Sequence, residues 1–175
     1  MALPRYVPHY TVGDYEAWEG RWELWSGLPV AMSPSPGRRH QEVASNLLFC
    51  LRQALLTADC ECCKVLYEID WRISSDTIVR PDLLIICDHK PSKWIEETPQ
   101  FVAEILSDST RERDLTYKRE MYQKLGVGYY LVIDPEAETY QLFEHTGTTY
   151  QESASPALNL SQTCRVTVDL DGLFA

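Results

Sequence analysis

The chain has 175 residues, 45% of them hydrophobic and 24% charged, with a formal net charge of −10 at pH 7. This composition is ordinary for a soluble globular protein, and the length predicts a single domain over residues 1–175 with its core at about 21–145. No apolar run approaches the roughly 20 residues that cross a bilayer, and the first residues lack the apolar core of a signal peptide, so we expect no membrane association and favour the cytoplasm. The acidic balance also excludes a broad basic surface of the kind that binds phosphate groups.

The N-terminal third predicts a helical turn, a hairpin and a long helix. Tyr15–Trp18 is assigned to the turn, and the strands Arg21–Trp25 and Leu28–Met32 surround a Ser-Gly pair that is typical of a hairpin. A loop rich in serine and proline follows at residues 33–37. From Arg38 to Leu56, apolar residues recur every three or four positions, which predicts a helix with one buried face.

The remaining segments predict a sheet with a second helix against it. Strands are expected at Lys64–Ile73, Arg80–Cys87, Phe101–Leu106, Tyr129–Asp134, Thr139–His145 and Arg165–Val168. A polar loop is expected at residues 88–93 and a helix over Thr110–Leu125. The pattern predicts an α/β fold: a mixed central β-sheet flanked by two helices, with the N-terminal hairpin added.

The six cysteines are interpreted as free thiols rather than disulfides. Cys50 lies in a helical pattern, Cys87 ends an apolar strand, and Cys60, Cys62 and Cys63 share one loop. In a cytosolic domain of this size, scattered cysteines usually behave as small hydrophobic residues. No second ligand pair stands elsewhere in the sequence, so we predict no zinc site.

Two carboxylates occupy strands that otherwise read as buried. Asp82 follows Pro81 at the start of an apolar strand, and Glu104 shares one face of its strand with Val102 and Leu106. If the two strands are neighbours, these acids converge, and a hard divalent ion such as Mg²⁺ would relieve their repulsion. The alternative is that each acid caps a strand end and reaches solvent separately.

A lysine interrupts the apolar stripe of the predicted helix over residues 110–125. Lys118 falls in the middle of the stripe formed by Leu115, Met121, Tyr122 and Leu125. A lysine there must either extend outward to water or meet a buried anion. Asp114, four residues earlier, offers an ordinary surface pair, but we favour contact with the acids of the strands. Two acids, a metal ion and an ammonium group together would suit the hydrolysis of phosphodiesters.

These residues resemble a known family. Pro81-Asp82 followed by Glu104 is similar to the PD-(D/E)XK, or restriction-endonuclease-like, superfamily. The segment Glu104-Ile-Leu-Ser107 with Asp114 and Lys118 resembles the bacterial Uma-two family, whose members are described as putative restriction endonucleases. The resemblance covers nearly the whole chain and implies a restriction-endonuclease-like fold.

The resemblance also implies roles for individual residues. Asp82 and Glu104 would be metal ligands, the backbone carbonyl of Ile105 would complete the coordination, and Lys118 would be the active-site lysine. In the superfamily that lysine usually stands two residues after the acid, where this chain has Leu106. The family implies a lysine moved to the following helix, in agreement with the apolar stripe.

Other residues are candidates for supporting roles. His40 and Glu42 lie in the first turn of the helix that begins at Arg38, where a structural or helix-dipole role is the alternative to an accessory place in the site. Glu23, inside the first strand, is read either as part of a solvated face or as functional. Four arginines could supply local positive charge for a nucleic acid: Arg38, Arg39, Arg111 and Arg113. The Trp- and Tyr-rich N-terminal region is the expected interface of a homodimer.

Two functions follow from these observations. The first is an endonuclease that hydrolyses phosphodiester bonds in DNA with Mg²⁺ or Mn²⁺, using Asp82, Glu104 and Lys118. The second is a catalytically silent nuclease-like domain that binds nucleic acid or another protein, which the net charge favours. A silent protein has no evident need for a lysine in an apolar stripe, so we favour the enzyme.

Overall fold

The computed structural model describes residues 7–32, 35–88 and 92–175. Parts of the loops predicted at 33–37 and 88–93 therefore lie outside the described residues. The helices are α1 (Val12–Tyr15), α2 (Arg38–Thr57), α3 (Arg111–Arg113), the π-helix η1 (Asp114–Lys118) and α4 (Arg119–Lys124). The strands are β1 (Trp22–Trp25), β2 (Leu28–Ala31), β3 (Cys63–Tyr67), β4 (Trp71–Ser74), β5 (Thr77–Val79), β6 (Leu83–Cys87), β7 (Phe101–Ile105), β8 (Tyr129–Asp134), β9 (Thr139–His145), β10 (Tyr150–Glu152), β11 (Ala157–Asn159) and β12 (Arg165–Thr167).

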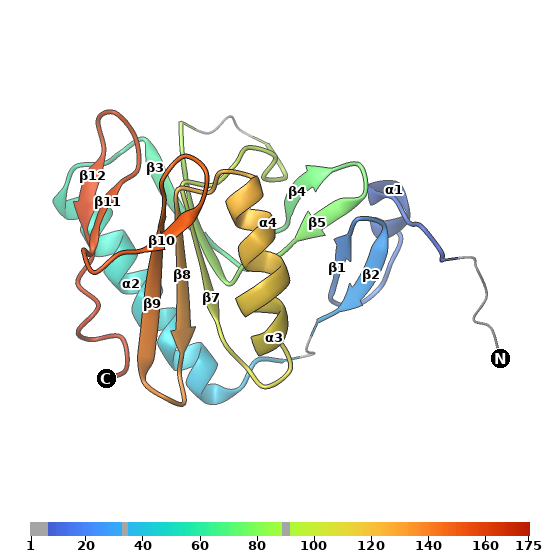
Figure 1. Cartoon of the computed structure of the whole chain (residues 1–175), viewed down its shortest axis with the longest axis horizontal. Helices are drawn as coiled ribbons and strands as arrows, with labels where there is room; N and C mark the ends of the chain where they lie inside the picture. The colour runs from blue at the N-terminus through green and yellow to red at the C-terminus, as the bar shows by residue number, and fades with distance from the viewer. Residues whose placement is uncertain (1–6, 33–34, 89–91) are drawn as a thin grey trace.

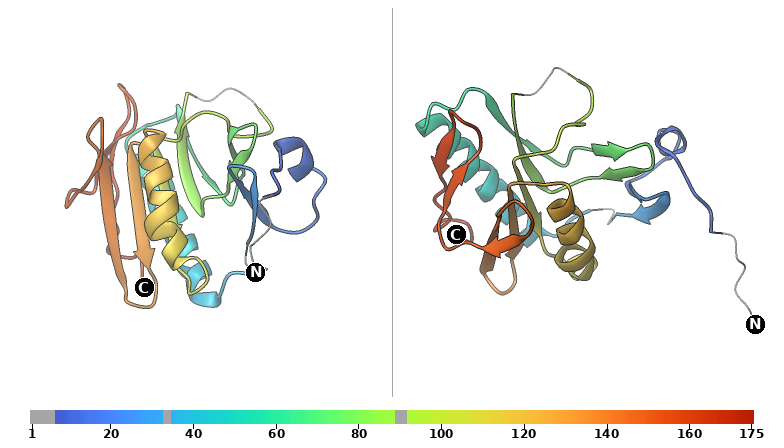
Figure 2. Two further views of the ribbon diagram at one scale, coloured as in Figure 1. Left: turned by 45° about the vertical axis from the view of Figure 1, so that its right-hand side comes forward. Right: turned by 45° about the horizontal axis from the view of Figure 1, so that its top comes forward.

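A six-stranded sheet in the order β10-β9-β8-β7-β6-β3 forms the centre of the molecule. It is mixed, because β7 and β8 run parallel while the other neighbours are antiparallel. Helix α2 covers one face, and the continuous α3-η1-α4 helix covers the other (Figures 1 and 2). The predicted α/β fold, with a mixed sheet between two helices and an N-terminal hairpin, is confirmed.

Side chains point alternately to the two faces of the central strands, so each strand contributes to the hydrophobic core on both sides of the sheet. On β7, Phe101, Ala103 and Ile105 pack in the core under α2, while Val102 packs in the core on the opposite face. All five residues of β6 and of β7 are buried, as expected for strands covered on both sides. Glu104 follows the alternation and faces the α3-η1-α4 helix, where an apolar residue would otherwise stand.

A second sheet of four strands, in the order β2-β1-β5-β4, stands beside the first (Figure 2). The prediction of one strand over Lys64–Ile73 is wrong, because β3 pairs with β6 in the large sheet while β4 pairs with β5 in the small one. The chain leaves the large sheet at Glu68, whose φ is 46°. It returns to that sheet at Asp82, whose backbone carbonyl accepts a hydrogen bond from the amide of Glu68 at 3.1 Å. Asp82 thus lies where the hairpin passes from one sheet to the other.

Two other segments differ from expectation. The first helical turn covers Val12–Tyr15 rather than Tyr15–Trp18, because Thr11 and Asp14 form a capping box that begins the helix earlier. The helix predicted over Thr110–Leu125 is present but contains one turn of π-helix, Asp114–Lys118. Such turns are rare and frequently lie at functional sites.

The prediction of free cysteines is wrong for four of the six. Cys60 pairs with Cys164, and Cys63 pairs with Cys87, leaving Cys50 and Cys62 free. Cys63 and Cys87 are direct partners in the register of β3 and β6, so the pairing depends on strand alignment that scattered positions do not reveal. The other disulfide joins the end of α2 to the β11–β12 hairpin, which packs in the core under α2.

None of the helices in the described ranges is long and apolar enough to cross a membrane.

Candidate active site

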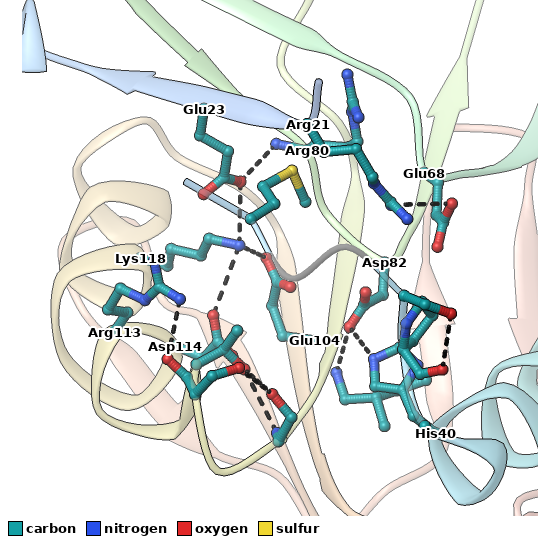
Figure 3. Close-up of a pocket in the computed structure, with 18 residues that line it drawn as sticks. Arg21, Glu23, His40, Glu68, Arg80, Asp82, Glu104, Arg113, Asp114 and Lys118 are labelled. Carbon is teal, nitrogen blue, oxygen red and sulfur yellow. Dashed lines mark hydrogen bonds and ion pairs between the residues drawn. The ribbon is translucent and has the colours of Figure 1, made fainter. Parts of the chain in front are cut away.

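A cleft opens at the junction of the two sheets and the α3-η1-α4 helix, with a volume of about 120 Å³. Glu104 from β7 and Asp82 from the turn before β6 enter it from the large sheet, Glu23 enters from β1, and Asp114 and Lys118 enter from η1 (Figure 3). The cleft therefore collects side chains from three layers of the structure around one lysine.

Lys118 is only 5% exposed and is surrounded by carboxylates. Its Nζ lies 3.0 Å from Oε1 of Glu104, 3.2 Å from Oε1 of Glu23 and 3.5 Å from Oδ1 of Asp114. Lys118 does pair with Asp114, but both side chains are buried, so this is not the surface pair that was the alternative interpretation of the sequence. Burial alone would lower the pKa of Lys118, but Glu104 and its neighbouring carboxylates hold the pKa well above its usual value, so the side chain carries a positive charge.

Glu104 is a fully enclosed acid of the cleft, only 2% exposed. Its Oε1 accepts hydrogen bonds from Nζ of Lys118 and, at 2.7 Å, from the hydroxyl of Tyr122, which is itself fully buried. Burial raises the pKa of Glu104 well above its usual value, Lys118 opposes this, and Asp114 and Asp82 add to it. The three carboxylates around Lys118 carry more negative charge than its one ammonium group offsets.

Glu23 is a member of the site that the sequence left open. Only 3% of it is exposed, so the solvated strand face is wrong. Its Oε1 accepts from the backbone amide of Arg80 at 2.7 Å, and its Oε2 accepts from Nε1 of Trp25 at 3.2 Å. Trp25 stacks on Tyr117 of η1 with ring centroids 4.4 Å apart, which holds β1 over the helix. Only the position of the second sheet reveals this contact, since strand alternation alone does not say what covers β1.

Asp82 is held by two donors. The amide of Ile105 donates to its Oδ2 at 2.7 Å, and Nε2 of His40 lies 3.2 Å from the same oxygen. Burial lowers the pKa of His40, and the contact with Asp82 more than offsets this, so the net shift is upward. His40, from the first turn of α2, therefore lies in the cleft beside Asp82, whereas Glu42 points away and pairs with Arg38 and Arg39.

The π-turn carries two of the side chains that line the cleft. Asp114 and Lys118 are the buried residues of η1, with Asp114 only 2% exposed. Its backbone carbonyl accepts from the hydroxyl of Tyr130 on β8 at 2.9 Å, so the widened turn is tied to the sheet. Burial raises the pKa of Asp114 and Lys118 lowers it, with the net shift upward.

The predicted arginines separate into two groups. Arg113 lines the cleft, and its guanidinium donates to the carbonyl of Ser109 at 2.9 Å. Arg38 pairs with Glu42, Arg39 with Glu138 and Arg111 with Asp134, and these three do not line the cleft. Arg21 and Arg80 line it although the sequence did not single them out.

The donor set of the cleft suits a hard cation more than a soft one. Within residues 7–32, 35–88 and 92–175, no three side chains of His, Cys, Asp or Glu gather in a way that could hold a metal ion. Asp82 and Glu104 nevertheless both line the cleft with the Ile105 backbone, which gives two carboxylates and a carbonyl. Since the amide and carbonyl of one residue in a strand point to the same side, the Ile105 carbonyl faces the side on which its amide meets Asp82. Oxygen donors of this kind and an excess of negative charge fit Mg²⁺.

Comparisons with known proteins identify the family and the fold of this chain. A sequence profile of the Uma2 family, described as "Putative restriction endonuclease", matches residues 12–171. The crystal structure of a putative nuclease belonging to DUF820 from Anabaena variabilis ATCC 29413 superposes with a TM-score of 0.72 at 14% identity, covering 94% of this chain and 97% of that chain. At such low identity the likeness shows the fold alone. No curated protein matches the chain. The family profile spans nearly the whole sequence, and the protein belongs to the Uma2 family of putative restriction endonucleases.

Proposed function

We propose that the protein is a Mg²⁺-dependent endonuclease that hydrolyses phosphodiester bonds in DNA, with Mn²⁺ as a substitute ion. The observation that carries this proposal is the contact of Lys118 with Glu104 at 3.0 Å, deep in a cleft that Asp82 also lines. A buried lysine among carboxylates stabilises a fold less well than packed hydrophobic residues, because desolvation offsets much of the attraction. Its presence here therefore favours a functional role for the charge. Family membership supports the same activity.

Asp82, Glu104 and the carbonyl of Ile105 would hold the ion. A bound Mg²⁺ would supply positive charge against the phosphate oxygens and lower the pKa of a water molecule. Glu104 has a pKa raised by burial and by other carboxylates, and a nearby divalent cation would favour its ionised form. The hydrogen bond from the Ile105 amide fixes one oxygen of Asp82 and so orients its carboxylate toward the cleft.

Lys118 would stabilise the negative charge that develops on the phosphate oxygens during hydrolysis. Glu23 and Asp114 act on it as positioning residues, since they bind the ammonium group from two other directions. Tyr122 donates to Oε1 of Glu104, the same oxygen that Lys118 contacts, and so helps to hold this carboxylate in place. His40 is an accessory residue that fixes Asp82, while Glu42 is proposed only as a surface partner of Arg38.

The decisive experiment combines metal binding and cleavage. Calorimetry with Mg²⁺ should show one binding isotherm for the wild type and none for Asp82→Ala/Glu104→Ala, and supercoiled plasmid should be nicked only by the wild type. Glu152→Ala, an exposed acid on β10, is the matched control and should behave as the wild type. Metal binding that survives in the double variant would overturn the assignment of both ligands.

Charge reversal of the arginines tests the contact with DNA. Arg113 lines the cleft, so Arg113→Glu should weaken plasmid binding and nicking, whereas Arg111→Glu should do so less because Arg111 is already paired with Asp134 at 2.6 Å. Arg38 and Arg39 remain predicted contacts at the start of α2. A homodimer through the N-terminal region also stays a prediction, which sedimentation of the full chain would test.

The alternative function is a catalytically silent domain that binds nucleic acid or another protein. Two observations favour it: the net charge of −10, and the fact that Glu104 and Asp82 already accept hydrogen bonds from Lys118 and Ile105. This alternative would be favoured if the protein bound no divalent ion and left plasmid, linear DNA and RNA uncut.

A further inference from the structure

A second hollow adjoins the catalytic cleft and differs from it in character. It has a volume of about 440 Å³, and its lining includes the indole rings of Trp18, Trp22 and Trp94. Arg80 lines both this hollow and the cleft. The backbone amide of Arg80 donates to Glu23 in the cleft, while its Nε donates to Oδ1 of Asp70 in the hollow at 2.7 Å. Arg80 is therefore a wall that the two spaces share.

The three indoles are held in place by contacts that leave each of them partly exposed. Trp18 packs edge-on against Trp22 with ring centroids 5.9 Å apart and against Tyr15 at 5.6 Å. Nε1 of Trp22 donates to the carbonyl of Glu19 at 2.8 Å. The guanidinium of Arg72 lies 3.8 Å from the ring centroid of Trp94. Trp18 and Trp22 are fixed but half-exposed, so a planar ligand can stack on them with little loss of conformational freedom. On Trp94 such a ligand would displace the exposed side chain of Lys93 from the ring.

The charges of the hollow favour an anion attached to that planar ligand. Arg72 is paired with Glu16 at 2.7 Å, and Arg80 is paired with Asp70, so these four charges cancel. Lys93 lies 4.4 Å from the ring centroid of Trp94 and makes no ion pair with any residue that the structure describes. Its positive charge beside the aromatic rings is therefore left without a carboxylate partner among the described residues. A cationic ligand would be repelled by Lys93, whereas a nucleotide offers a base to the aromatic rings and a phosphate to Lys93.

We propose that this aromatic hollow binds an unpaired nucleobase of the nucleic acid whose backbone lies in the cleft. The inference rests on the proposed nuclease function and deepens it, because it names the substrate as a strand with unpaired nucleotides. A base inside a duplex has both faces stacked and cannot enter a pocket, but single-stranded nucleic acids are commonly held by stacking of bases on aromatic side chains. The adjacent phosphate would meet Lys93, and the strand would continue past Arg80 to Lys118.

The first test measures binding without hydrolysis. A fluorescein-labelled oligonucleotide of twelve thymidines, in EDTA, should bind the wild type and lose about fivefold to about hundredfold in affinity with Trp94→Ala or Trp18→Ala, the range for loss of one stacked base. Trp94→Phe should retain most of the affinity. Phe49→Ala, which removes a 68% exposed ring on α2, is the matched control and should change nothing. Thermal unfolding should confirm that the variants fold, since the Trp94 ring lies against two side chains at the surface, those of Arg72 and Lys93.

The second test identifies the base itself. Replacing single thymidines by abasic nucleotides should weaken binding to the wild type at one position, and the same replacement should cause no further loss in Trp94→Ala. Unchanged affinity in both tryptophan variants, equal loss for a duplex of the same sequence, or no binding of the oligonucleotide by the wild type would each overturn the proposal. Plasmid nicking that is insensitive to both variants would leave the nuclease intact and remove only this pocket. Tryptophan-dependent binding without any cleavage would leave the pocket intact and remove the nuclease.

Discussion

The two faces of the six-stranded sheet are built on different principles. Under α2 the core is apolar throughout, from Leu47 and Leu51 on the helix to Ile85 and Ile133 on the strands. Under the α3-η1-α4 helix the apolar core gives way, at its end nearest the second sheet, to the buried charges of Glu104 and its partners. Since buried charges stabilise a fold less well than packed hydrophobic residues of similar volume, the first face serves stability, and we propose that the second serves chemistry.

The largest expected effect follows from removing the central charge of the second face. Lys118→Met should reduce plasmid nicking by at least about 100-fold, because it removes electrostatic stabilisation of the developing negative charge. It should also lower the free energy of unfolding by about 3 to 5 kcal/mol, since the carboxylates lose their buried partner. Both effects are read from nicking assays and urea denaturation.

Lys124→Met is the matched control for that variant. Lys124 belongs to the same helix, is 76% exposed and pairs with Glu120 at 3.8 Å on the surface. It should change the free energy of unfolding by less than about 1 kcal/mol and leave nicking intact. If Lys118→Met nicked DNA at the wild-type rate, the division of the two faces into stability and chemistry would be refuted.

The opposite result is expected on the first face. Leu47 is fully buried, and Leu47→Ala should lower the free energy of unfolding by about 2 to 5 kcal/mol through the cavity it leaves. Because no atom of Leu47 lines the cleft, the nicking rate per folded molecule should stay that of the wild type. A cavity variant that lost activity while still folded would show that the α2 face also tunes the site.

The same contrast explains what could be predicted from the sequence. The buried stripe of α2, the alternation that turns Glu104 inward and the misplaced lysine at Lys118 are local patterns, and all three are present in the structure. Local patterns also predicted a sheet between two helices. These features depend on which residues share one face of a helix or strand, and the periodicity of the sequence determines which residues do so.

The rest depends on contacts between distant segments. Glu23 joins the site only because β1 belongs to a second sheet that stands over η1. That sheet was missed because the segment Lys64–Ile73 alternates without interruption, although its chain turns at Glu68. The disulfides were missed for a similar reason, since Cys60 meets a cysteine 104 positions away. The functional roles of Asp82, Glu104 and Lys118 remain predictions for the experiments above.

The Cys60–Cys164 disulfide lies in the core under α2, so its removal should lower the free energy of unfolding without changing the cleft on the other face. Cys60→Ser should lower the free energy of unfolding by about 2 to 4 kcal/mol, because a loop closed over 104 positions is freed in the unfolded chain. Reduction of the wild type should act in the same direction, and Cys50→Ser, a free cysteine on α2, should have little effect. Alkylation and mass spectrometry of the native protein should count two free thiols; six would contradict both pairings.

The smallest expected effect lies where the second face meets the sheet edge. Arg111 at the start of α3 donates to Oδ2 of Asp134 at the end of β8, and this contact is the main reason that the pKa of Asp134 lies below its usual value. A lowered pKa means that the contact stabilises the folded state when Asp134 is ionised and that this contribution disappears as the pH falls through the lowered pKa. Arg111 is 46% exposed, so Arg111→Ala should lower the free energy of unfolding by no more than about 1 kcal/mol at neutral pH. In acid the variant and the wild type should converge. A difference that stayed constant or grew on acidification would mean that Arg111 acts through packing of α3 rather than through its charge.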